Sequence, residues 1–82
     1  MNAKLDKKWT RYGNKHLQGL RIARVRYLTE AETTALGWHK RPLVLVLDNG
    51  TLVFPSKDDE GNDGGAMFGQ TAKGEELTFP VL

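Results

Sequence analysis

The stretch that decides the fold is Leu43-Val44-Leu45-Val46-Leu47-Asp48-Asn49-Gly50-Thr51-Leu52-Val53-Phe54-Pro55. Residues 43–47 are apolar without a polar break, which predicts a strand buried on both faces and therefore central in its sheet. Asn49-Gly50 tolerates the positive φ angles that a two-residue type I′ turn requires. Residues 52–54 return as the next strand, and Pro55 ends it. We therefore predict a β-hairpin over residues 43–55 at the centre of the fold.

A short helix is expected ahead of this hairpin. Thr29-Glu30-Ala31-Glu32 matches a capping box, in which the Thr29 hydroxyl accepts from the amide of Glu32 and the Glu32 carboxylate accepts from the amide of Thr29. Gly37 suits the left-handed conformation that ends many helices. The helix is therefore predicted at about residues 29–37, and Trp38 is expected to fold back onto the core.

Two more strands are expected on either side of these elements. Residues 20–28 favour a strand with a bulge near residues 22–23, where the alternation breaks, although a helical stripe is the competing interpretation. The alternation places Ala23, Val25 and Tyr27 on one face of this strand and Arg24 and Arg26 on the other. Residues 77–81 alternate as a last strand, at a sheet edge because Pro80 has no amide to donate. Residues 56–76 are expected to be loop, with a short apolar segment at 66–68 docked on the core.

These elements predict one small α+β domain. The sheet is expected to be antiparallel, and a partly open SH3-like or Sm-like barrel is the more specific hypothesis. The globular part is assigned to residues 20–82. Residues 1–19 show no helical or strand period that holds for long, so they are interpreted as a basic arm, either loose or tied down by Trp9 and Tyr12.

Composition excludes several classes of function. The 82-residue chain has no cysteine, which rules out disulfides, a thiol nucleophile and cysteine-ligated metals. The longest apolar run, 43–47, is far too short for a membrane span, and no secretory signal is present. No catalytic grouping or cofactor motif is recognisable. We expect a soluble cytoplasmic protein that is not an enzyme and needs no cofactor.

Charge is unevenly distributed and indicates an anionic partner. Residues 1–28 carry a net charge of +7 and residues 29–82 a net charge of −5. Cations interleaved with aromatic residues are typical of nucleic-acid or nucleotide binders, where cations contact phosphates and rings stack on bases. The residues predicted to bind the anion are Lys7, Lys8, Trp9, Arg11, Tyr12, Arg24 and Arg26.

Two alternatives remain open. The first is a protein-interaction module, such as a phage-type inhibitor of a host protein or a small homo-oligomer, with a contact loop at Trp38, Lys40 and Arg41; the competing interpretation is that Trp38 caps the core. The second is a small-ligand or metal binder that uses the loop 58–65. Its candidate ligands are Asp58, Asp59, Glu60 and Asp63, although their spacing fails the EF-hand pattern.

Part of the chain resembles a known group of proteins. The chain is similar to a group of short uncharacterised bacterial and phage proteins over roughly residues 20–70. The similar segments are Tyr27-Leu28-Thr29-Glu30, Leu36-Gly37-Trp38, 41–52 and 54–62. The resemblance implies no activity and transfers no site residue. It favours a small stand-alone protein over a fragment of an enzyme.

Overall fold

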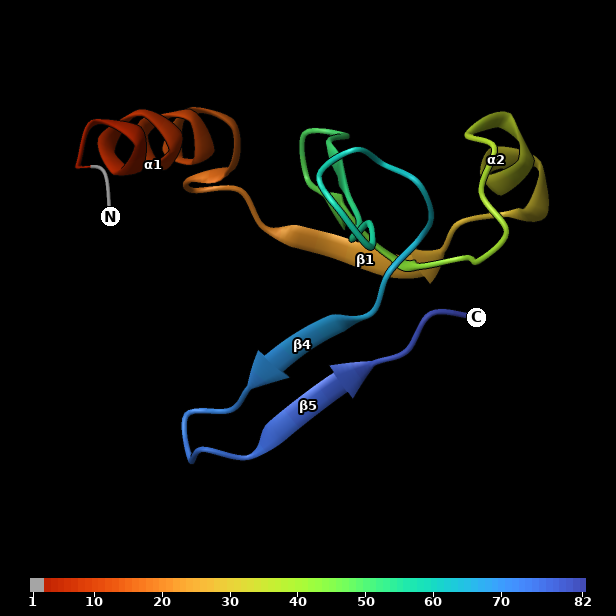
Figure 1. The fold of residues 1–82 in the computed structure, drawn as a ribbon. Helices are drawn as coiled ribbons and strands as arrows, with labels where there is room; N and C mark the ends of the chain where they lie inside the picture. The colour runs from red at the N-terminus through yellow and green to blue at the C-terminus, as the bar shows by residue number, and fades with distance from the viewer. Residues whose placement is uncertain (1–2) are drawn as a thin grey trace.

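Residues 3–82 are described by the computed structural model, which has two helices and two small antiparallel sheets (Figure 1). The elements, in chain order, are α1 (Ala3–Leu17), β1 (Ile22–Tyr27), α2 (Glu30–Ala35), β2 (Leu43–Leu47), β3 (Leu52–Val53), β4 (Met67–Gln70) and β5 (Glu76–Phe79). One sheet has the order β1-β2-β3 and the other pairs β4 with β5. The α+β class is therefore confirmed. The two sheets are not closed into a barrel, so the SH3-like or Sm-like detail is not confirmed.

The central hairpin forms as predicted, but its turn is of a different type. β2 lies between β1 and β3, and Leu45 pairs with Val53. The amide of Gly50 donates to the Leu47 carbonyl (3.0 Å), and the amide of Leu47 donates to the Thr51 carbonyl (2.9 Å). Among residues 3–82 only glycines have positive φ, and Gly50 is at +90°. The loop is therefore a three-residue type I turn with a left-handed glycine bulge.

The predicted two-residue type I′ turn is wrong because the Asn49 side chain makes a hydrogen bond to the backbone within the three-residue loop. Its Oδ1 accepts a hydrogen bond from the amide of Thr51 at 3.0 Å. That local bond is made with Asn49 at negative φ, and only Gly50 needs the left-handed region.

β1 carries the predicted bulge, and Arg24 and Arg26 lie on the face opposite Val25 and Tyr27, as the alternation predicts. Ile22 pairs with Leu47 whereas Arg24 pairs with Val46, so the register shifts between Ile22 and Arg24. Residues that pair directly share a face of the sheet. Both arginines of β1 therefore lie on the face of Val44 and Val46, where the core packs. Since β2 is apolar on both faces, the alternation of β1 alone does not decide which face points to the core.

The core is small and gathers around Trp38. Among residues 3–82, the buried apolar side chains are Leu28, Trp38, Pro42, Val44 and Leu47. The Trp38 ring meets Phe54 edge to face, with centroids 5.8 Å apart, and its Nε1 donates to the Gly61 carbonyl at 2.6 Å. The expectation that Trp38 folds onto the core is confirmed.

α2 starts and stops as predicted. The Thr29 hydroxyl accepts from the amide of Glu32 (3.1 Å), and the Glu32 Oε1 accepts from the amide of Thr29 (2.9 Å), which completes the capping box. Gly37 follows with a φ of +75°. The helix is one residue shorter at its start and two at its end than the range expected.

β4 and β5 form a second hairpin, called here the arm (residues 67–79), which runs below β1 in Figure 1. Its turn has the same hydrogen-bond pattern as the turn of the central hairpin. The amide of Gly74 donates to the Thr71 carbonyl, the amide of Thr71 donates to the Glu75 carbonyl, and Gly74 has a φ of +90°. The Tyr27 hydroxyl donates to the Pro80 carbonyl at 3.0 Å, which links the base of the arm to β1. Phe68 is 79% exposed, so the expected docking of its ring on the core is wrong.

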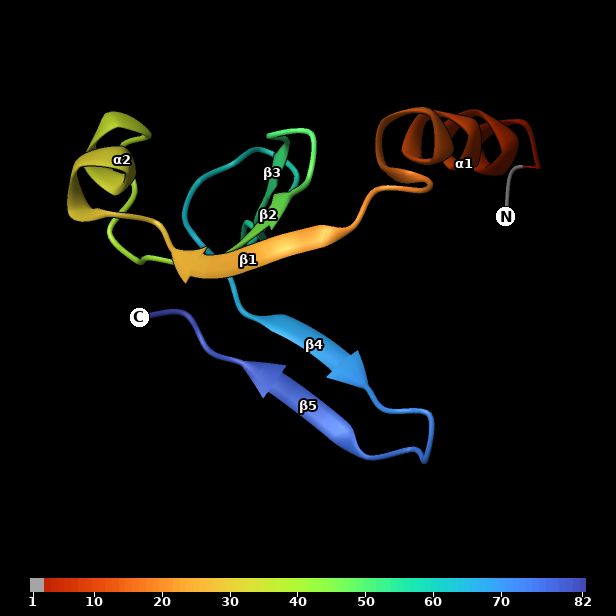
Figure 2. The same ribbon diagram turned by 180° about the vertical axis from the view of Figure 1, so that it is seen from behind.

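The N-terminal segment, which the sequence analysis interpreted as an irregular basic arm, contains the helix α1. It is a continuous 15-residue helix, and none of its residues is buried. Figures 1 and 2 show it beyond one end of β1, with α2 beyond the other. None of the helices within residues 3–82 is long and apolar enough to cross a membrane.

Candidate functional site

The candidate site is the exposed surface of α1, where helix formation sorts the basic and aromatic residues into two neighbouring stripes. An α-helix brings residues three and four positions apart onto one face. The basic stripe has this spacing, and so does the aromatic stripe, which is offset from it by one residue. The basic stripe consists of Lys4, Lys8, Arg11 and Lys15, with Lys7 at its border. The aromatic stripe consists of Leu5, Trp9, Tyr12 and His16.

The aromatic stripe is ordered by ring contacts but stays open to solvent. The rings of Trp9 and Tyr12 meet edge to face at a centroid distance of 5.5 Å, and the ring of His16 lies 4.5 Å from that of Tyr12. Trp9 is 57% exposed and Tyr12 is 56% exposed. Large aromatic surfaces normally pack into a core or an interface. These rings are therefore available to a ligand while being held in place by one another.

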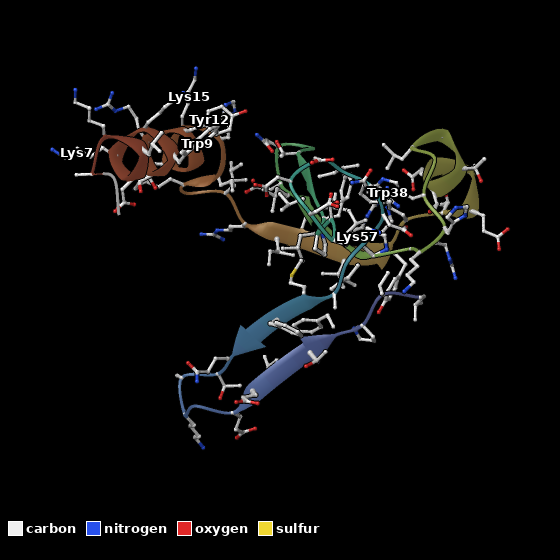
Figure 3. All side chains as sticks on the ribbon, viewed as in Figure 1. Lys7, Trp9, Tyr12, Lys15, Trp38 and Lys57 are labelled. Carbon is white, nitrogen blue, oxygen red and sulfur yellow. The ribbon has the colours of Figure 1, made fainter. Side chains whose placement is uncertain are left out.

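Cations border the same rings. The Lys8 Nζ lies 5.2 Å from the centroid of the Trp9 ring, within the range of a cation–π contact. A surface hollow of about 390 Å³ is lined by both stripes: Lys8, Trp9, Arg11, Tyr12 and Lys15. Figure 3 shows Lys7 and Lys15 reaching outward from α1. The arrangement offers positive charge and aromatic faces side by side.

The loop 58–65, called here the acidic loop, lies near one border of the aromatic stripe. Trp9 and Asp59 both line one hollow of about 550 Å³. On the helix, Trp9 is the aromatic side chain furthest around from the basic stripe. The negative charge of the acidic loop therefore lies near the side of the aromatic stripe that is away from the basic stripe.

The other two predicted anion-binding residues lie on β1, outside the α1 stripes. Arg24 is exposed on β1. Arg26 is engaged within the chain: its guanidinium donates to both carboxylate oxygens of Glu32, at 2.8 and 3.1 Å. This ion pair joins β1 to the first turn of α2. The structure brings five of the seven predicted residues together on α1 and gives Arg26 a partner of its own.

The predicted interaction loop at 38–41 is largely occupied by the fold. Trp38 is 8% exposed and sits in the core (Figure 3). The amide of Lys40 donates to Asp63 Oδ1 at 3.0 Å, although the residue itself is exposed. Arg41 exchanges two backbone hydrogen bonds with Leu82, at 2.7 and 2.9 Å.

The acidic loop uses its carboxylates to shape its own backbone. Asp63 Oδ1 accepts from the amides of His39, Lys40 and Gly64, and these bonds, that from Lys40 first, lower the pKa of Asp63. Asp58 accepts from the Asn62 side chain and from the amides of Asn62 and Glu60, which lowers its pKa as well. Asp59 and Glu60 are exposed. Within residues 3–82, no group of three or more His, Cys, Asp or Glu side chains is placed to hold a metal ion.

The sequence interpretation missed α1, and with it four members of the site. Residues 3–17 must be helical before these four join the stripes: Lys4, Leu5, Lys15 and His16. The signal was present in the charges, since lysine or arginine recurs at 4, 8, 11 and 15. The apolar residues Leu5, Trp9 and Tyr12 repeat with the same helical spacing, so this period could also have been recognised.

Comparisons with known proteins identify no relatives. No protein-family model matches the chain. No curated protein and no solved structure matches it either. The resemblance to short bacterial and phage proteins therefore stays a prediction, and the functional argument rests on the chain's own residues.

Proposed function

We propose that the protein is a non-enzymatic nucleic-acid-binding module that holds a single-stranded segment along α1. The observation that carries this proposal is the pair of stripes on α1, cations beside exposed rings on a helix with no buried residue. Phosphates would lie along the basic stripe, and bases would stack on Trp9 and Tyr12.

Single strands fit the site better than duplexes for a physical reason. Bases in a duplex are already stacked on each other, so the rings of α1 gain little from them. Bases in a single strand present open faces to any aromatic ring, and one such contact is worth about 1–3 kcal/mol. The proposal therefore expects tighter binding to single-stranded than to duplex oligonucleotides of equal length.

Salt dependence tests the electrostatic part. Fluorescence anisotropy with a labelled single-stranded oligonucleotide, measured across a salt series, reports the number of phosphates that the cations neutralise. Five cations predict a slope of roughly −3 to −4 in log affinity against log salt. Undetectable binding at low salt, or binding that salt does not weaken, would rule the proposal out.

Charge-reversal variants locate the site. The double variant Arg11→Glu/Lys15→Glu removes two adjacent cations of the basic stripe and should weaken binding by on the order of tenfold or more. The matched control is Lys57→Glu/Lys73→Glu, which changes the net charge equally in the body and the arm and should have a much smaller effect. Equal losses in the two variants would place the binding elsewhere or make it a property of net charge alone.

Tryptophan fluorescence tests the stacking part. The chain has two tryptophans, and only Trp9 is exposed. A bound strand should quench the emission of Trp9, and Trp9→Phe should remove the quenching while Trp38 continues to emit. Trp9→Ala should weaken binding to single strands more than to duplexes. A helix that instead binds a protein partner through its rings would show neither quenching by oligonucleotides nor salt-dependent affinity.

A further inference from the structure

We propose that the arm is a dimerisation surface, at which two copies of this chain pack around Phe68 across a two-fold axis. The proposal does not rest on nucleic-acid binding, since the arm and α1 are separate parts of the molecule (Figure 1).

The single chain leaves a large amount of surface exposed. Its accessible surface is 6607 Å². A folded monomer of this mass, 9.2 kDa, is expected to expose about 4,900 Å². The radius of gyration is 14.3 Å, against about 12 Å for a compact chain of this length. The excess surface is ample for one side of a stable dimer, which needs about 800 Å² per partner.

The arm projects and exposes apolar side chains. The two projecting elements are α1 and the arm (Figure 1). The surface of α1 is rich in cations, whereas the arm carries only Lys73 beside Glu75 and Glu76. On the arm, Phe68 is 79% exposed on the face that it shares with Thr78, and Leu77 and Phe79, each 37% exposed, lie on the opposite face. A surface of this kind repels phosphates and suits an apolar protein contact.

The arm is incomplete as a sheet. A lone two-stranded hairpin is at best marginally stable in water, and three or more strands with an apolar face are needed for independent stability. β4 and β5 pair only with each other, so each strand leaves one edge without a strand partner in the described part of the chain. A second arm placed against the first supplies the missing layer or strands.

The face of the arm that carries Phe68 also carries a hollow. Phe68 pairs with Thr78 across the hairpin, and both line a hollow of about 500 Å³ together with Gln70 and Glu76. A projecting ring and a hollow on one small patch allow each copy to seat its Phe68 in the hollow of the other. A two-fold axis makes both contacts at once, which is the arrangement of an isologous dimer.

The oligomeric state gives the first test. Sedimentation equilibrium of the full chain should show a reversible monomer–dimer equilibrium. Phe68→Glu should raise the dimer dissociation constant by about thirtyfold or more, as expected for a central anchor residue. Because the Phe68 side chain is 79% exposed, this variant should keep the monomer folded. The matched control is Leu36→Glu, at the 48% exposed residue that caps the C-terminus of α2, which should leave the equilibrium unchanged.

Site-directed crosslinking gives the second test and does not depend on a destabilising variant. The chain has no cysteine, so Thr78→Cys introduces a single thiol beside Phe68. A short bismaleimide should join two copies of Thr78→Cys rapidly. It should join Thr34→Cys, the matched control on the exposed side of α2, only slowly.

Several results would overturn the proposal. One is a strict monomer at every protein concentration used for sedimentation equilibrium. The others are a dimer that Phe68→Glu leaves intact and equal crosslinking of the two thiol variants. A continuous ladder of higher oligomers would also contradict it, because a two-fold contact closes after two copies.

Discussion

At the scale of single residues, Glu32 connects two elements of the fold, the strand β1 and the helix α2. Its Oε1 accepts a hydrogen bond from the amide of Thr29. Its two carboxylate oxygens also accept hydrogen bonds from Nη1 and Nη2 of Arg26. One side chain therefore caps α2 and ties that helix to β1. The Arg26 hydrogen bond and then the Thr29 amide lower the pKa of Glu32 to about 2.

This pKa shift predicts a pH dependence of stability. The folded-state pKa lies below the ordinary value of 4.5, so the unfolded chain binds more protons between these two values. The stabilisation from Glu32 is then fully present above about pH 5 and is lost as the pH falls toward 2. Urea unfolding of the wild type and of Glu32→Gln, from pH 7 to pH 2.5, should show a difference in stability that shrinks with falling pH. A difference independent of pH would mean that the charge of Glu32 plays no part.

Gly64 gives a second prediction at this scale. A Cβ at this buried position would lie 2.6 Å from the Lys40 carbonyl oxygen and 2.7 Å from Pro42 Cδ. Both neighbours belong to the segment that leads into β2, so neither can move away easily. Gly64→Ala should lower the free energy of unfolding by about 1–3 kcal/mol, which thermal denaturation will detect. An unchanged melting temperature would show that the 56–65 loop is not held against residues 40–42.

At the scale of the elements, the sequence predicted what local chemistry determines. The capping box, the stop at Gly37 and the strand at 43–47 depend on neighbouring residues, and all three formed. Which face of β1 points to the core could not be predicted, because it depends on contacts between distant elements, the Arg26–Glu32 pair and the packing of Trp38 on Phe54. The arm was missed in part because Ala72-Lys73-Gly74 is a weaker turn signal than Asn49-Gly50. Much of the candidate site was named from charge and aromatic content, but only the helix shows that those residues form stripes.

α1 carries a prediction of its own, because its stability is local. A 15-residue helix with no buried residue is marginal in water. Gly13 lies within it, and an added Cβ would meet nothing within 4 Å. Gly13→Ala should therefore favour the helical state of α1 by about 1 kcal/mol and increase the circular dichroism signal at 222 nm. The substitution is also the control for Gly64→Ala, since it has the opposite sign. No gain in helicity would indicate that α1 is already held by contacts with the body or with a second copy.

At the scale of the whole molecule, the structure divides into a body with a small core around Trp38 and an exposed helix that shares little of it. A cooperative transition requires elements to stabilise one another. Trp38 meets Phe54 and the Gly61 carbonyl, so its fluorescence reports the body. Ellipticity at 222 nm reports mainly α1, the longer of the two helices.

We therefore expect the two signals to change separately when the protein is unfolded by urea. In Trp9→Phe, where Trp38 is the remaining tryptophan, ellipticity at 222 nm should decline from the lowest urea concentrations. The emission of Trp38 should stay constant and then change in one later transition. Adding Gly13→Ala should shift the first signal to higher urea and leave the midpoint of the second unchanged, because the core contains no residue of α1. Coincident transitions at a fixed protein concentration would contradict this division, since they would require α1 to be stabilised by the body.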